Sequence, residues 1–357
     1  MKRALSPALA VLVALAITVG LVVLIGSRGS HDPVATTSTS TTLSGRVKAE
    51  AEPARAWQKQ VIAAFTPIVD ASPELIKGGR EWIAGTRPTE QFQQELDLDI
   101  TRFGAARNDV ADIAPYKRAP QAIGLYREGA QLYLEFARVY RAAVTTPPGD
   151  ARTQLDLLAR RVRELGDRIY DRGTAAMAPF VHDDPLKDVD VRLPEEVPRW
   201  AEEGMAPGPP LDDQPPAASE SPPLRAKTRP EQSVSAWTAA VRSTAIPSAS
   251  ELAAAIDAGN GDAVRNLARS YVDAAERLRS TPDPRGAREK SAITRLALLV
   301  AADGARAAQA STVVDGEAAE ALRNVGRRLA LVADHLWPSD LGVRHTGFDP
   351  GLLTGSG

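Results

Sequence analysis

The sequence contains no cysteine among its 357 residues. This absence excludes disulfide bonds, thiol catalysis and thiolate metal sites, and it also excludes a lipid-modified cysteine as a membrane anchor. An excess of basic charge is missing as well, because the formal net charge at pH 7 is −2. General nucleic-acid binders carry a strong basic excess. We therefore expect no nucleic-acid partner.

Motifs for catalysis and metal binding are also missing. None of the four histidines lies three or four residues from a second histidine or from a glutamate, so metal-ligand spacing on one helix face does not occur. A phosphate-binding loop, a dinucleotide fingerprint, a zincin motif and a Gly-x-Ser-x-Gly elbow are absent from the sequence. The aspartates between 183 and 190 lack the turn glycine of a calcium loop. We predict no catalytic residue, no metal and no cofactor, and hence no enzyme.

The N-terminal segment predicts a membrane anchor. Residues 8–26 are uncharged and apolar, and their length matches one helix across the hydrocarbon core. Lys2 and Arg3 outweigh the single Arg28, so residues 1–7 should stay in the cytoplasm and the bulk of the chain should lie outside. A cleaved signal peptide remains the alternative, although Arg28 and its neighbours offer a poor cleavage site.

Residues 27–49 follow the predicted span and are rich in serine and threonine. A polar run of this kind cannot bury enough apolar surface to order itself, so we expect a flexible tether. The composition also permits an O-glycosylated stalk.

An internal repeat organises the rest of the chain. The stretch from 149 to 170 is matched without gaps by the stretch from 316 to 337. Each stretch places apolar residues at spacings of three and four, which predicts an amphipathic helix with a narrow apolar seam. Such a helix needs partners to cover its seam, so each copy should belong to a helical bundle. The seam residues are Leu155, Leu158, Val162, Leu165 and Ile169 in the first copy and Leu322, Val325, Leu329, Val332 and Leu336 in the second.

The predicted fold is all-α, with a transmembrane helix followed by two duplicated helical bundles. Repeat 1 covers residues 50–178, repeat 2 covers 233–340, and an irregular tail covers 341–357. Between the repeats, residues 179–232 contain twelve prolines and scattered acids, which predicts a flexible linker. Within it, Trp200 is expected to dock on this chain or on a partner. We expect the two repeats to fold separately.

At the start of repeat 1, the sequence favours two helices. The first carries Trp57 and ends near Pro67, because proline interrupts the helical hydrogen bonds. The second begins at Ser72, which can cap a helix, and stops at Gly85. Repeat 2 restates these landmarks, with Pro247 in the place of Pro67.

Two groups of residues are candidates for binding. Tyr126, Tyr133 and Tyr140 follow one another at seven-residue spacing, so they could line a small-molecule pocket between the helices of repeat 1. Core filling is the alternative, since their counterparts in repeat 2 are mostly alanine or leucine.

The second group consists of paired arginines at equivalent places in the two repeats. They could contact anionic headgroups or an acidic wall polymer, or they could pair with nearby acids and solvate the helix face. These arginines are Arg160, Arg161, Arg327 and Arg328. We expect Arg161 to be exposed and Leu158 to be buried.

The function that fits these observations is a membrane-tethered extracytoplasmic binding or scaffold protein of a bacterial envelope, with a protein or envelope component as its partner. A ligand-sensing module with a pocket in repeat 1 is the alternative.

Overall fold

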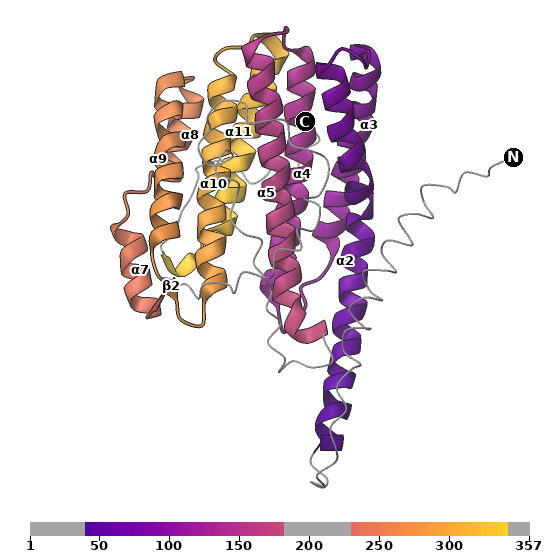
Figure 1. The fold of residues 1–357 in the computed structure, drawn as a ribbon, viewed down its shortest axis with the longest axis vertical. Helices are drawn as coiled ribbons and strands as arrows, with labels where there is room; N and C mark the ends of the chain where they lie inside the picture. The colour runs from indigo at the N-terminus through magenta and orange to yellow at the C-terminus, as the bar shows by residue number, and fades with distance from the viewer. Residues whose placement is uncertain (1–39, 182–229, 342–357) are drawn as a thin grey trace, which may run out of the picture. The chain divides into compact units, whose positions relative to one another are not determined.

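The computed structural model describes residues 40–181 and 230–341. These residues are mostly helical, which confirms the all-α class for the described part of the chain (Figure 1). The described residues from 47 onward group into one compact unit. The helices of repeat 1 are α2 (Ser40–Ile83), α3 (Thr89–Asp112), α4 (Pro120–Thr145) and α5 (Asp150–Val181). Those of repeat 2 are α7 (Val234–Ser243), α8 (Ala249–Asp257), α9 (Gly261–Ser280), α10 (Arg288–Ala310), α11 (Gly316–Leu336) and the 3-10 helix η1 (Ser339–Leu341).

Two short strands, β1 (Glu231–Gln232) and β2 (Asp283–Pro284), pair in parallel at one end of repeat 2. They join the segment before α7 to the turn between α9 and α10. The pairing includes a hydrogen bond from the amide of Asp283 to the carbonyl of Pro230, at 2.9 Å. The sequence did not predict these strands.

The predicted break in the first helix of repeat 1 is wrong, because α2 runs through Pro53, Pro67 and Pro73 without interruption. Ile68 directly follows Pro67 and is fully buried, so its packing holds the helix together across the proline. In repeat 2 the corresponding residue is Ser248. Its side chain caps α8 in a capping box with Glu251, and the chain is split into α7 and α8 there.

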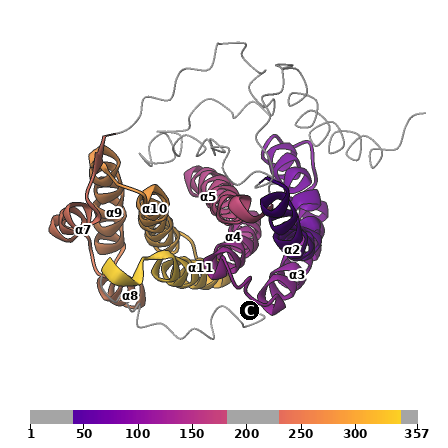
Figure 2. The same ribbon diagram turned by 90° about the horizontal axis from the view of Figure 1, so that it is seen from below.

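Four helices form the centre of the compact unit. The hairpin of α4 and α5 packs against the hairpin of α10 and α11, with α5 beside α10 and α4 beside α11 (Figures 1 and 2). Figure 2 shows α2 and α3 beyond α4 on one side, and α7, α8 and α9 beyond α10 on the other. The neighbouring helices of the two repeats run antiparallel, because the numbering of paired residues rises on one helix while it falls on the other.

The seam prediction is confirmed. All ten seam residues are buried, with Leu155, Val162, Ile169, Leu322 and Val325 among those that have no exposed surface. Helix ends also follow the sequence. Gly259 adopts a positive φ of 61° after α8, and the side chain of Asn260 then caps α9.

The two repeats are not separate bodies, because their central hairpins share one core. Their independent folding in isolation stays a prediction. Helix α2 begins at Ser40, so the last residues of the predicted tether are helical. Among the described helices, none has the length and apolar character that crossing a membrane requires. The predicted span at 8–26, Trp200 with the linker around it, and the tail beyond 341 lie outside the described residues.

Candidate functional site

The most unusual chemistry of the described chain is a set of charged side chains buried where the repeats meet. Helix α5 carries Arg161 one turn after Leu158, and its guanidinium Nε donates a hydrogen bond to Oδ1 of Asp303 on α10, at 3.0 Å. Arg306, one turn along α10, donates to the same oxygen at 2.6 Å. Asp303 is only 2% exposed, so this carboxylate is held by two cations inside the protein. We call Arg161, Asp303 and Arg306 the Asp303 triad.

The second triad has the same construction with the repeats exchanged. Arg328 of α11 donates from Nε to Oε1 of Glu135 on α4, at 2.6 Å. Arg138, one turn along α4, donates to the same oxygen at 2.8 Å. The amide of Gln131 adds a third donor at 2.6 Å. Glu135 is fully buried. We call Arg328, Glu135 and Arg138 the Glu135 triad.

Burial and charge act in opposite directions on these arginines. Burial is the largest influence on the pKa of Arg161 and lowers it, while the neighbouring Asp303 raises it. The pKa of Arg138 is also lowered by burial and is raised by Glu135. A guanidinium keeps its proton under these conditions, so each carboxylate lies between permanent cations.

The two triads occupy equivalent positions in the repeats. In each repeat the carboxylate takes one arginine from its own helix and one from the other repeat. The contact is therefore reciprocal, as in a twofold-symmetric dimer. The residues that correspond in the two sequences are Glu135 with Asp303, Arg138 with Arg306, and Arg161 with Arg328.

No protein family, curated protein or solved structure matches this chain.

Two further ion pairs join the repeats, but they are not formed by residues that correspond in the two sequences. Arg172 of α5 donates to Glu289 of α10 at 3.1 Å. His335, near the end of α11, lies 2.9 Å from a carboxylate oxygen of Glu128 on α4. The hydrogen bond to Glu128 is the main cause of a raised pKa at His335.

The expectation that Arg161 is exposed is wrong, because its side chain is 8% exposed and Arg328 is similarly buried. The reason is that α5 and α11 each bury two sides, one against their own repeat and one against the other repeat. Arg160 pairs with Asp156 on its own helix at 2.8 Å. All four candidate arginines are thus engaged by carboxylates of this chain, and the geometry favours the ion-pair interpretation over an anionic surface.

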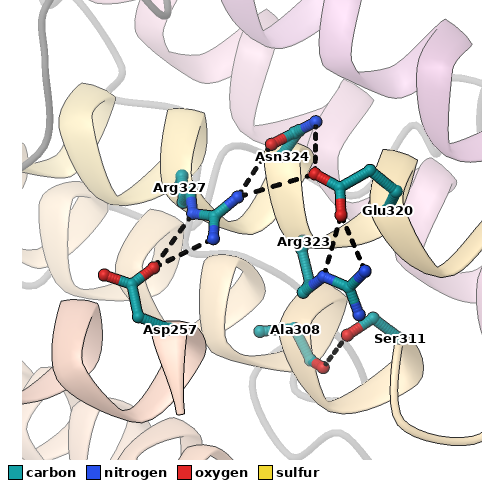
Figure 3. A network of polar contacts seen from close by, with 7 residues as sticks. All are labelled: Asp257, Ala308, Ser311, Glu320, Arg323, Asn324 and Arg327. Carbon is teal, nitrogen blue, oxygen red and sulfur yellow. Dashed lines mark hydrogen bonds and ion pairs between the residues drawn. The ribbon is translucent and has the colours of Figure 1, made fainter. Parts of the chain in front are cut away.

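Arg327 belongs to a more open cluster on repeat 2. Figure 3 shows its guanidinium between Asp257 of α8 and Glu320 of α11. One Nη donates to Asp257 at 2.9 Å, and the other donates to Asn324 at 2.9 Å. Glu320 also accepts from Arg323 at 2.7 Å. Both Asp257 and Glu320 have side chains more than half exposed, so this cluster links α8 to α11 at the surface.

The three candidate tyrosines fill the core of repeat 1. Tyr126 and Tyr133 pack against the ring of Phe65 from α2. The hydroxyl of Tyr140 donates to Asp156 at 2.9 Å, and that of Tyr133 donates to Asp167. Burial raises the pKa of Tyr126 to about 12, and it also raises the pKa of Tyr133 and Tyr140. This arrangement corresponds to core filling.

Sequence reasoning missed Glu135, Asp303 and the arginine that follows each of them by three residues. A signal was present, since Glu135-Phe-Ala-Arg138 and Asp303-Gly-Ala-Arg306 place the same charged pair inside two otherwise apolar helices. Charges inside a buried pattern indicate a partner on another element. Among the described residues, no group of three or more histidine, aspartate or glutamate side chains is arranged to hold a metal ion.

Proposed function

We propose that this protein is a non-catalytic binding or scaffold protein of a bacterial envelope, tethered to the membrane by residues 8–26. The observation that carries the scaffold role is the reciprocal pair of buried triads. They join the two repeats into one compact unit, to which the outer helices of both repeats belong. This supports a scaffold role, because a scaffold presents its binding surfaces on one body.

The outer side of α2 is the proposed binding face. Ile62 and Val69 lie seven residues apart on this helix, and they are 48% and 53% exposed. Ile83 continues the same heptad spacing near the end of the helix and is 46% exposed. Side chains seven residues apart share one side of a helix, so they offer an apolar strip on which a partner helix can rest.

The anchor is tested by fractionation. The full chain is expected to remain with bacterial membranes after a high-pH wash, and a version lacking residues 1–26 should be released. Protease added to intact spheroplasts should digest the repeats. Recovery of the full chain in the soluble fraction, or protection of the repeats from external protease, would contradict the proposal.

The binding face is tested by site-specific photo-crosslinking in cells. A photoreactive amino acid in place of Val69 should give one discrete adduct, and Ile62→Lys in the same chain should abolish it. The matched control places the photoreactive residue at Gln94, which lies on the neighbouring helix α3. If positions 69 and 94 give the same pattern, α2 is not the binding face.

A further inference from the structure

The contact between the repeats has the form of a dimer interface folded into one chain. Arg161 of repeat 1 reaches Asp303 of repeat 2, and the equivalent Arg328 of repeat 2 reaches Glu135 of repeat 1. In a twofold-symmetric interface, residue i of one subunit contacts residue j of the other, and j contacts i in return. The two triads satisfy this relation with residues that correspond in the two repeats.

The arrangement of the helices agrees with this relation. Helix α4 occupies in repeat 1 the place that α10 occupies in repeat 2, and α5 corresponds in the same way to α11. The contacts of α5 with α10 and of α4 with α11 are therefore two copies of one kind of contact, and both are antiparallel. An approximate twofold axis that runs along the four central helices relates the two hairpins (Figure 2).

We propose that the face by which each central hairpin contacts the other repeat is self-complementary. When the contact with repeat 2 is prevented, the face of repeat 1, formed by α4 and α5, binds the same face of a second copy of this chain. In that pairing Arg161 of each copy meets Glu135 of the other. Glu135 already carries Arg138 one turn away, just as Asp303 carries Arg306. Each of the two new contacts therefore joins opposite charges, and Glu135 of each copy keeps two arginine partners.

The hairpin of repeat 2 has the same property, with Arg328 meeting Asp303 of a second copy. In the unmodified chain the two faces are joined by a covalent connection, so each meets the other at a high effective concentration. In the unmodified chain, the face of repeat 1 therefore binds the face of repeat 2 of the same chain. This recognition between the repeats is independent of the proposed function.

Charge reversal on one repeat tests the proposal in the full chain. The first variant, Asp303→Arg with Arg328→Glu, sets arginine against Arg161 and glutamate against Glu135 and leaves the face of repeat 1 intact. The second variant, Arg161→Asp with Glu135→Arg, sets aspartate against Asp303 and arginine against Arg328. It leaves the face of repeat 2 intact. The third variant carries all four changes, so that both contacts between the repeats again join opposite charges.

The mass of each variant in a non-ionic detergent is measured by light scattering, with helicity checked by circular dichroism. Each two-site variant is expected to have twice the protein mass of the unmodified chain, and the four-site variant should return to the mass of the unmodified chain. A discrete dimer from either two-site variant that reverts in the four-site variant supports the proposal. If neither gives such a dimer, whether both stay single, unfold or form larger aggregates, the faces are not self-complementary and the proposal is overturned.

Discussion

Replacing Arg161 by alanine removes one of the two cations that hold Asp303. The side chains of Arg161 and Asp303 are 8% and 2% exposed, so water cannot replace the lost guanidinium easily. Breaking a buried ion pair from one side costs about 3 to 5 kcal/mol, because the other charge remains buried. Asp303 keeps Arg306, and we therefore expect a somewhat smaller loss of unfolding free energy, about 2 to 4 kcal/mol.

Arg265→Ala is the matched control. Arg265 pairs with Asp262 one turn earlier on α9, and the two side chains are 47% and 84% exposed. An exposed pair of this kind contributes less than about 1 kcal/mol. Both variants remove one arginine from a helix, so the difference between them isolates the effect of burial.

Urea unfolding of the full chain in a non-ionic detergent, followed by far-ultraviolet circular dichroism, measures both variants. If Arg161→Ala costs no more than Arg265→Ala, the carboxylate of Asp303 is not held across the repeats, and the reasoning on both triads fails.

Other contacts of the described chain support three more predictions. Leu158→Ala should lower the unfolding free energy by about 2 to 5 kcal/mol in the same urea assay, because the side chain is buried in the seam. The raised pKa of His335 means that its pairing with Glu128 stabilises the folded chain fully below the ordinary histidine pKa, and that this stability is lost as pH rises through the raised value. Urea titrations from pH 6 to 9 should show this loss of unfolding free energy, with the pH dependence of one titrating proton. His335→Gln should abolish that pH dependence. Gly326→Ala should destabilise by about 1 to 3 kcal/mol in thermal or urea unfolding, because its new methyl group would meet a backbone oxygen at 2.9 Å. Gly104→Ala, where nothing lies within 4 Å, should instead stabilise by about 0.5 to 1 kcal/mol, and equal effects at the two glycines would contradict the close helix approach.

The helices of the described chain were predictable because their apolar residues follow the helical period. The seam around Leu158 identifies one buried side of α5 from the sequence alone, and the ends of α9 follow from Asn260 and from Thr281 before Pro282. These signals are local, since each depends on residues within a few turns of one another.

The second buried side of α5 and α11 was not predictable from either helix by itself. From the sequence alone, an arginine at the border of a seam is expected to be solvated unless its partner is known. The partner of Arg161, Asp303, lies on a different helix 142 residues away. The continuity of α2 through Pro67 was missed for a related reason. Proline indicates a helix end, but Ile68 is fully buried by tertiary packing, which outweighs the lost hydrogen bond.

The separate cores of the two repeats and the interface between the repeats are under different physical constraints. In the cores behind the central hairpins, Tyr126 and Tyr140 of repeat 1 correspond to Thr294 and Ala308 of repeat 2, in the same alignment that matches Glu135 with Asp303. Each of those cores needs only to fill its own volume, so its residues can change together with its own outer helices.

The triads are constrained more tightly, because a carboxylate on one repeat and an arginine on the other must change together. A single change on either side removes the partner of a buried charge, which lowers the unfolding free energy by about 2 to 4 kcal/mol. The interface therefore resists divergence while the outer helices do not. Any difference in what the two repeats bind should then be found on α2 and α3 in repeat 1 and on α7, α8 and α9 in repeat 2, where the sequences differ most in length and in helix breaks.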